Sequence, residues 1–120
     1  MHAGRLDDAR PFTTLDGSTI REVAGPVSLP SANQSLAEAT VEPGGETQAH
    51  LHRTSEELYL FTQGMGRIRV DGEEREVRAG DCVVLPPGAE HKLWNTGGEP
   101  LRLLCCCAPP YRHEDTVITE

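Results

Sequence analysis

The run HLHRTSEELYLFTQG occupies residues 50–64 of this 120-residue chain and contains two histidines one residue apart. Alternate side chains of a β-strand point to the same face, so His50 and His52 would lie on one face, roughly 6.5 Å apart. Residues 53–56 are enough for a tight connection to a second strand that begins near Glu57. On a curved strand the two imidazoles would converge on one metal ion. Isolated H-x-H pairs are also common on protein surfaces, so evidence is needed from the rest of the chain.

The composition favours a small β-protein. A chain of 120 residues is about the size of one domain. Aromatic residues make up only 4%, whereas 12 glycines and 9 prolines supply many turns, and this combination is typical of short strands joined by tight turns. The 11 basic and 19 acidic side chains leave a formal net charge of −8. Such a surface repels phosphate backbones, so we expect no nucleic-acid partner.

The sequence contains no segment typical of secretion or of membrane insertion. Its first residues, MHAGRLDDARPF, lack the apolar centre of a signal peptide. No apolar run approaches the ~20 residues of a membrane span. We therefore expect a cytoplasmic location and no membrane partner.

Turn-forming residues divide the chain into short segments at a regular spacing. Five runs between the turns are predicted to be strands: Ser35–Val41, Glu57–Phe61, Arg67–Val70, Cys82–Leu85 and Leu101–Ala108. Polar and apolar residues alternate along 67–70, and the Asp-Gly pair at 71–72 predicts a hairpin turn directly afterwards. Strands at such spacing are typical of a sandwich or barrel. Residues 1 to about 10 and about 113 to 120 are predicted to be loose or partner-dependent ends.

The four cysteines are Cys82 and the consecutive run Cys105, Cys106 and Cys107. They lack the C-x2-C spacing of a zinc site, and neighbours on one strand are poorly placed to form a disulfide with each other. Cys105 and Cys107 would share one face of a strand, and Cys106 would take the other. We interpret the run as small, reduced core residues. A redox or metal-binding role is the alternative.

A third histidine follows the turn at Pro86-Pro87-Gly88, and with it the sequence contains two motifs on which it resembles the cupin family. The first family motif, G-x5-H-x-H-x3,4-E-x6-G, is matched by Gly44, His50, His52, Glu57 and Gly64. The second, G-x5-P-x-G-x2-H-x3-N, is matched by Gly80, Pro86, Gly88, His91 and Asn95. Every fixed position is present, and 15 residues separate the two motifs.

The resemblance implies an all-β fold in a single domain, the cupin double-stranded β-helix or jelly-roll barrel. Its core would have six strands in two antiparallel sheets, with extra strands from the termini. Residues 34–111 would form the barrel, and residues 1–33 would be N-terminal strands or an arm that packs on the barrel or on a partner subunit. Residues 112–120 would be a C-terminal tail. Its charged cluster at 113–115 is interpreted as a solvated end, with a lid or a clasp on a second subunit as the alternative.

The resemblance also implies one divalent transition-metal ion per chain, with four protein ligands: His50, His52, Glu57 and His91. Glu56 remains the alternative to Glu57, because the family accepts three or four residues before its glutamate. Counting back six residues from Gly64 selects Glu57. Nitrogen and oxygen ligands without sulfur do not distinguish manganese, iron, cobalt, nickel, copper and zinc from one another.

Strand parity suggests which other residues line the pocket. Gln48 shares the face of the two histidines in the first motif, and Leu93 shares that of His91. Tyr59 and Phe61 share the face of Glu57. Glu57 and Tyr59 are the candidate catalytic residues, since Tyr59 could offer a hydroxyl to a bound substrate. A strand tyrosine that simply packs with its hydroxyl satisfied is the alternative.

The implied ligand set favours an enzyme that acts on a small neutral or weakly acidic molecule. We expect a metal-dependent dioxygenase or related oxidoreductase, because open positions on the ion would hold substrate and dioxygen. A non-redox isomerase or cyclase and a non-catalytic ligand-binding or metal-binding module are the alternatives. Sugar-phosphate isomerisation is disfavoured, because the arginines at 67, 69, 75 and 78 form no phosphate-binding pattern.

We also expect a homodimer. A six-stranded core leaves apolar residues on the outer faces of the sheets, and Leu58, Leu60 and Trp94 point outward by parity. A second copy would cover them by packing one sheet on another, or a terminal strand would pair with the neighbour's edge.

Overall fold

The computed structural model describes residues 1–120, which form eleven β-strands and two 3-10 helices. None of its helices has the length and apolar character that a membrane crossing requires. In chain order the elements are η1 (Leu6–Asp8), β1 (Phe12–Thr13), β2 (Thr19–Ala24), β3 (Ser35–Val41), β4 (His50–His52), β5 (Glu56–Gln63), β6 (Met65–Val70), β7 (Glu73–Arg78), β8 (Cys82–Leu85), β9 (His91–Asn95), β10 (Leu101–Ala108), η2 (His113–Asp115) and β11 (Thr116–Ile118).

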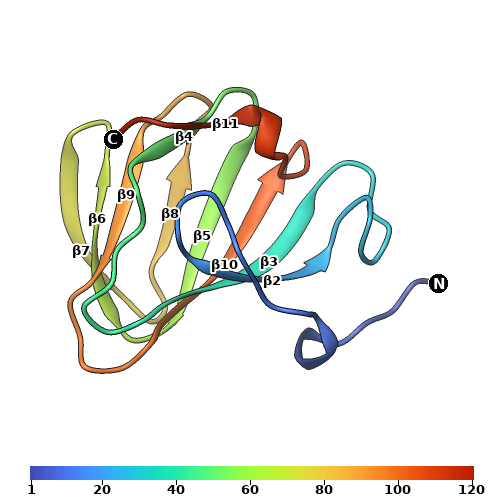
Figure 1. Ribbon diagram of the computed structural model, residues 1–120, viewed down its shortest axis with the longest axis horizontal. Helices are drawn as coiled ribbons and strands as arrows, with labels where there is room; N and C mark the ends of the chain where they lie inside the picture. Colours follow the sequence, from blue (N-terminus) through green and yellow to red (C-terminus); the bar gives the residue numbers. More distant parts are fainter.

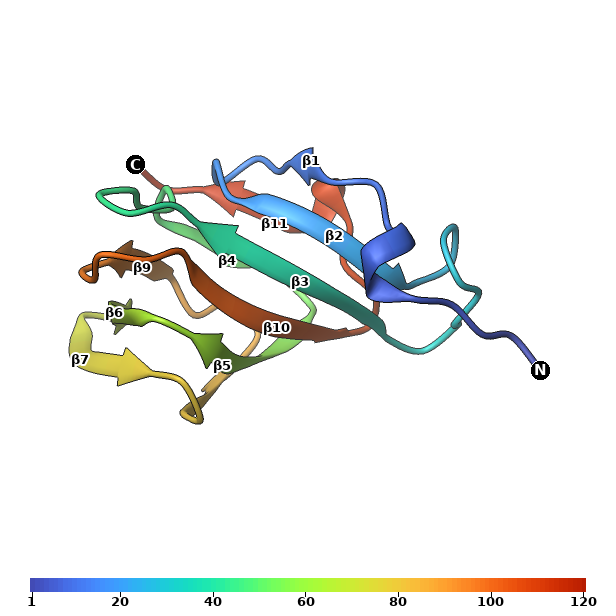
Figure 2. The ribbon, with the colours of Figure 1, turned by 90° about the horizontal axis from the view of Figure 1, so that it is seen from below.

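The strands form two antiparallel sheets. One has six strands in the order β1-β2-β3-β10-β5-β8, and the other has five in the order β11-β4-β9-β6-β7. Figure 1 shows both layers, and Figure 2 shows β2, β3 and β10 running side by side. The expected all-β, single-domain fold of two antiparallel sheets is therefore confirmed.

The predicted strands agree closely with the observed ones. β3, β8 and β10 have the predicted bounds, whereas β5 and β6 are longer than predicted by one or two residues at their ends. The hairpin turn at 71–72 is also confirmed: Asp71 has a φ of 47° and Gly72 a φ of 83°. Positive φ at both central positions is the conformation that the right-handed twist of a two-residue hairpin requires.

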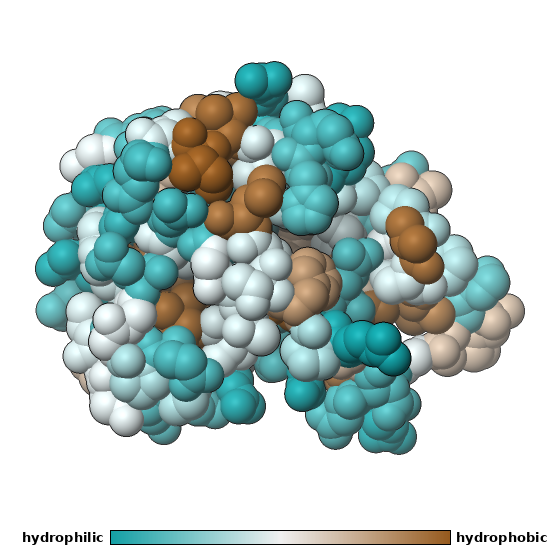
Figure 3. All heavy atoms as spheres, viewed as in Figure 1, coloured by the Kyte–Doolittle hydropathy of each residue, from teal (hydrophilic) through white to brown (hydrophobic).

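The core lies between the two sheets, where alternate residues of each strand meet. Its largest fully buried side chains are Phe61, Ile68, Leu85, Leu101, Leu103 and Val77. On the outside, Leu58 and Leu60 are 39% and 41% exposed, as their parity predicts. Trp94 is half-buried, because the guanidinium of Arg67 lies 4.5 Å from the centre of its ring. Figure 3 shows a face on which hydrophilic residues predominate and hydrophobic ones form small separate groups.

The prediction that residues 113–120 form a loose end is wrong. β11 pairs with β4, so the tail extends the smaller sheet. Buried Asp115 accepts hydrogen bonds from the backbone N–H groups of Thr54 and Ser55, at 2.9 and 3.1 Å, and from the hydroxyl of Thr54 at 2.8 Å. These bonds bind the tail to the connection between β4 and β5, which carry the first motif.

Candidate functional site

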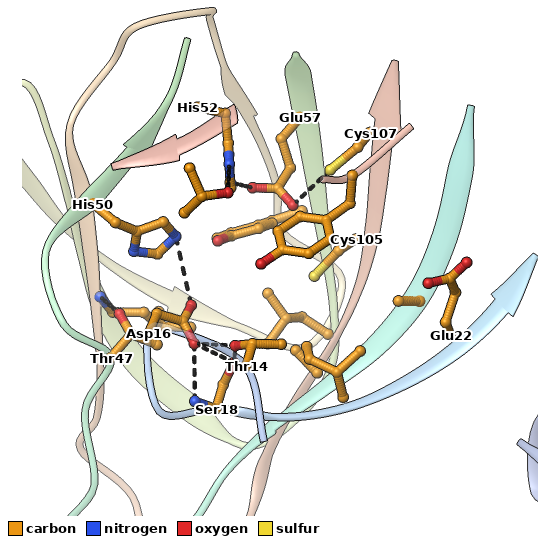
Figure 4. A pocket seen from close by; sticks show the side chains of 18 of the residues that line it. Thr14, Asp16, Ser18, Glu22, Thr47, His50, His52, Glu57, Cys105 and Cys107 are labelled. Atoms are coloured by element: carbon orange, nitrogen blue, oxygen red, sulfur yellow. Dashed lines mark hydrogen bonds and ion pairs between the residues drawn. The ribbon is translucent and has the colours of Figure 1, made fainter. Parts of the chain in front are cut away.

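Three histidines converge inside the barrel at one end of the smaller sheet. His50 and His52 lie on β4, and His91 begins the neighbouring strand β9, where it pairs directly with His50. All three are buried, and each offers one ring nitrogen within 4.8 Å of those of the other two. His50 and His52 therefore share the inward face of β4, as strand parity predicts (Figure 4). The pairing of β4 with β9 brings the third histidine, His91, beside them.

The outer nitrogen of each histidine is held by a hydrogen bond that fixes its tautomer. The Nδ1 atoms of His50 and His91 lie 2.7 and 2.9 Å from backbone carbonyl oxygens. A carbonyl accepts only, so each Nδ1 must carry the proton. His52 Nδ1 lies 3.0 Å from the hydroxyl of Thr116, which gives its own hydrogen to the carbonyl of Arg112. His52 therefore also donates from Nδ1, and in the neutral imidazoles all three Nε2 atoms carry a free lone pair.

Glu57 completes the cluster from the opposite sheet. Its Oε1 lies 3.2 Å from His52 Nε2 and 3.6 Å from His91 Nε2. Its Oε2 accepts a hydrogen bond from the Cys107 thiol at 3.0 Å. Glu57 is buried whereas Glu56 is exposed, so the geometry selects Glu57 as the carboxylate that faces the histidines.

The donor set fits a cation. Lone pairs of neutral imidazoles face a carboxylate oxygen, and the buried Oε1 of Glu57 and Nε2 of His91 have no hydrogen-bond partner. A buried polar atom without a partner costs about 1–3 kcal/mol, and more when it is charged. A divalent transition metal among these atoms would satisfy all of them, and imidazole with carboxylate is a ligand set that such ions accept. The buried cluster is therefore consistent with metal binding.

The protonation states of His91 and Glu57 also suit metal binding. Burial, with repulsion from His50, lowers the pKa of His91 from 6.5 to about 4, although Glu57 acts in the opposite direction. Burial raises the pKa of Glu57, but its proximity to the imidazoles of His52 and His91 outweighs this and lowers it. At neutral pH His91 is therefore neutral and Glu57 is ionised, and these are the forms that bind metals.

A cavity of about 60 Å³ adjoins the cluster. One water molecule needs about 10–15 Å³ on this measure, so the cavity has room for a small molecule. Eleven of its 21 lining residues are hydrophobic. The cavity is lined by three acidic residues, Asp16, Glu22 and Glu57. No lysine or arginine lines it.

Asp16 is a feature of the site that the sequence did not reveal. It lies in the turn between β1 and β2, and its Oδ2 is 3.5 Å from Nε2 of His50. Burial raises the pKa of Asp16, but attraction to His50 and hydrogen bonds from Ser18 and Thr14 outweigh this and lower it. No motif contains Asp16, and an Asp-Gly pair in a turn is the only signal that the sequence offers at this position.

Two of the four residues expected to line the pocket do so, and two do not. Tyr59 and Leu93 do line it. Phe61 is instead part of the core cluster and does not reach the cavity. Gln48 is exposed and lies outside the cavity, contrary to the expectation from parity; Thr47 lines it in its place. Strict alternation fails here because β4 begins only at residue 50, and residues 49 and 50 are both buried.

The hydroxyl of Tyr59 makes no hydrogen bond within the protein, although the side chain is buried against His91. Burial and the charge of Glu57 raise the pKa of Tyr59 well above its usual value. Tyr59 therefore stays protonated and is suited to donate a hydrogen bond to a ligand, rather than to accept a proton.

Further lining residues come from β10 and from the chain after it. Cys105 and Cys107 are buried with reduced thiols, as expected, but they face the cavity. Cys106 is half-buried and points to the other face. The ring of Tyr111 packs edge-on against His52 with centroids 5.8 Å apart. The alternation along 105–107 predicts these faces, whereas nothing in the sequence predicts the position of Tyr111.

The comparisons with known proteins agree with this architecture. A family model described as "Cupin domain" matches residues 37–107. The uncharacterized protein MJ1618 of Methanocaldococcus jannaschii is 47% identical over 114 residues, which span 95% of this chain and 91% of that protein. The mannose-1-phosphate guanylyltransferase of Klebsiella pneumoniae is 33% identical over 79 residues, which are 66% of this chain but only 17% of that enzyme.

Among solved structures, the formate complex of Lactobacillus farciminis oxalate decarboxylase superposes with a TM-score of 0.82. The two sequences are 26% identical, and the alignment covers 95% of this chain and 34% of the decarboxylase. The match therefore concerns one part of a longer protein.

Proposed function

Because the chain belongs to the cupin family, we propose that it is an enzyme that uses one divalent transition-metal ion to act on a small neutral or weakly acidic molecule. The ligands in this proposal are His50, His52, Glu57 and His91. The observation that supports it most directly is the arrangement of free donor atoms. Three imidazole lone pairs and one carboxylate oxygen face one another, with no hydrogen available between them.

Residues around the ligands hold them in the form that a metal needs. The carbonyl oxygens of Gln48 and Ala89 and the hydroxyl of Thr116 keep the outer nitrogens of the histidines protonated. Such partners orient the ring and increase the basicity of the ligating nitrogen. The Cys107 thiol donates a hydrogen bond to Oε2 of Glu57, and Oε1 remains free for the ion. When bound, the ion would supply a Lewis acid with positions left open for a ligand.

The proposed reaction class is an oxygen-dependent oxidation of the dioxygenase type. Such a reaction needs only the ion, the substrate and dioxygen, and no organic cofactor. Tyr59 would donate a hydrogen bond to the bound substrate, since this residue lines the cavity and its hydroxyl makes no hydrogen bond within the protein. The apolar wall would exclude water from the reacting atoms.

One observation favours a second candidate, a non-redox isomerase or cyclase. Two thiols, of Cys105 and Cys107, line the cavity in reduced form. Thiols beside a centre that handles dioxygen are exposed to oxidation to sulfenic or sulfinic acid. A Lewis-acid reaction would not expose the two thiols to oxidation.

The charge of the cavity supports a neutral rather than an anionic substrate. Its charged lining residues are all acidic, so no side chain is available to neutralise a phosphate or a second carboxylate. For this reason we do not extend the substrate of oxalate decarboxylase, a dicarboxylic acid, to this chain. Neutral carbonyl compounds that also carry a hydroxyl or enol fit the cavity better.

Metal analysis of the purified protein tests the ligand proposal. We expect close to one transition-metal ion per chain in the wild type and a large loss in His52→Ala. His2→Ala is the matched control, because His2 is exposed and distant from the cluster in the sequence, and it should retain the metal. Equal metal content in the two variants would contradict the proposal.

Oxygen dependence tests the reaction class. The metal-loaded protein would be assayed with a panel of diketones, hydroxy-ketones, thiols and flavonols, with and without oxygen. Consumption of dioxygen in step with substrate would support the oxidation. Equal turnover without oxygen would contradict it and favour the isomerase or cyclase.

A further inference from the structure

Asp16 lies across the cluster from Glu57 and belongs to a part of the chain outside the family match at 37–107. The turn between β1 and β2 brings it into the lining of the cavity, and in Figure 4 it points toward His50 while Glu57 approaches from the other side. Its Oδ2 is 3.5 Å from Nε2 of His50. The family ligand set gives this carboxylate no role.

The turn holds one oxygen of Asp16 and leaves the other free. Oδ1 accepts hydrogen bonds from the hydroxyls of Thr14 and Ser18, both at 2.6 Å, and from the backbone N–H of Ser18 at 2.9 Å. The carbonyl of Asp16 accepts a bond of 2.8 Å from the backbone N–H of Gln48, which fastens the turn to the segment before β4. Oδ2 makes no hydrogen bond and is therefore oriented in advance toward the cavity.

The surroundings of Oδ2 call for a hydrogen-bond donor. In neutral His50, the form that would bind a metal, Nδ1 holds the proton and Nε2 carries a lone pair, so Nε2 offers no hydrogen to Oδ2 of Asp16. No lysine or arginine lines the cavity to pair with the carboxylate. The Asp16 side chain is only 13% exposed, so water satisfies it poorly. A ligand that binds beside His50 and offers an O–H or N–H group would meet this need.

We propose that Asp16 is a specificity-determining residue: its Oδ2 accepts a hydrogen bond from a hydroxyl or N–H group of the substrate, and its charge repels carboxylates. The substrate class that fits is a neutral carbonyl compound with a hydroxyl or enol next to the carbonyl. The carbonyl oxygen would be held at the metal, and the adjacent hydroxyl would face Asp16. This inference rests on the proposed metal site and adds the substrate's chemistry to it.

The size of the effect follows from the kind of bond. A hydrogen bond to a charged acceptor in a poorly hydrated site contributes roughly a 10- to 100-fold difference in affinity. Asp16→Asn removes the charge but keeps the shape of the side chain. We therefore expect this variant to bind a hydroxyl donor more weakly by roughly that factor and a carboxylate more tightly.

Ligand titrations of the full chain loaded with Co(II) test the proposal, with the visible absorption of the ion as the readout. The three probes are hydroxyacetone, its methyl ether methoxyacetone, and acetate. In the wild type hydroxyacetone should bind more tightly than the ether. In Asp16→Asn this preference should disappear and acetate should bind more tightly, while the affinity for Co(II) stays the same. Asp8→Asn, the same change at an exposed position, should behave as the wild type.

A second variant separates charge from shape. Asp16→Glu keeps the charge, so acetate should bind as weakly as it does to the wild type. If Asp16→Glu admits acetate as readily as Asp16→Asn does, the proposal is overturned. It is also overturned if Asp16→Asn loses Co(II), since Asp16 would then be a ligand, or if all three probes weaken together, since its role would then be structural.

The same titrations distinguish a failure of the proposed metal site from a failure of the proposed role of Asp16. Absence of Co(II) binding by the wild type would contradict the proposed function and with it the role of Asp16. Normal Co(II) binding with equal affinity for hydroxyacetone and methoxyacetone would contradict the role of Asp16 alone.

Discussion

Acidification of the metal-free protein should destabilise it mainly through His91. The pKa of His91 is lowered from 6.5 to about 4 in the folded chain, chiefly by burial. In the unfolded chain it returns to its ordinary value. Between these two values the unfolded chain binds more protons than the folded one, so the free energy of unfolding falls as the pH falls.

The magnitude follows from the two pKa values. Each pKa unit is worth 1.36 kcal/mol, so a shift from 6.5 to about 4 gives about 2.5 kcal/mol between pH 8 and pH 4.5. His91 is only 2% exposed, so solvent screening does not reduce this value much. In a chain of this size the loss corresponds to a fall in Tm on the order of 10 °C. The carboxylates with lowered pKa values add to the loss only below about pH 4.5.

Urea unfolding of chelator-treated protein at several pH values from 4.5 to 8 would measure this dependence. His91→Asn removes the titrating group, so its free energy of unfolding should vary much less over the same range. Equal pH dependence in the two proteins would refute the reasoning. So would a free energy of unfolding that rises on acidification.

Three further predictions concern the ligands, the tail and the outer face. Glu57→Gln should lose most of the metal in elemental analysis, whereas Glu56→Gln should keep it, because only Glu57 is buried and faces the histidines. Asp115→Ala should lower the free energy of unfolding by about 2–3 kcal/mol in urea titrations, since a buried carboxylate that holds the connection at 53–55 is lost; a loss below about 0.5 kcal/mol would contradict this account. Light scattering should give the mass of a dimer for the wild type and that of a monomer for Leu60→Lys, since Leu60 is an exposed apolar residue of the larger sheet; a wild-type monomer of 13.1 kDa at micromolar concentration would contradict it.

Much of the buried histidine–carboxylate cluster could be predicted from sequence, because local rules place His50, His52 and Glu57. His50 and His52 share a face in any regular strand, and the glycines of the motif fix where the strands begin and end. Glu57 follows at a distance along the chain that allows one tight connection. His91 enters through the pairing of β4 with β9, which sequence alone does not give but the family pattern implies. The spacing to Gly64 favours Glu57 over Glu56, and the structure agrees, since Glu57 is buried and Glu56 is exposed on the other face of the strand.

The walls of the cavity could not be predicted in the same way. Gln48 lies just before a strand, where alternation has not yet begun, and its side chain turns to solvent. Asp16 and Tyr111 reach the cavity through loops, whose course depends on tertiary contacts rather than on a periodic pattern. The charge of the tail predicts a loose end, but Asp115 is buried because three hydrogen bonds replace its hydration.

The distribution of these residues suggests a division of roles within the chain. The histidines and Glu57 lie inside the matched region 37–107, whereas Asp16 comes from the segment before it. Thr116, from the segment after it, fixes the tautomer of His52. In the proposals above, the terminal segments would therefore adjust both what the cavity accepts and how firmly one ligand is held, while the barrel motifs would supply the ligands. A relative that keeps the motifs but differs at Asp16 should bind the metal in the same way and prefer a different ligand, because the group that faces the open side of the cluster would have changed.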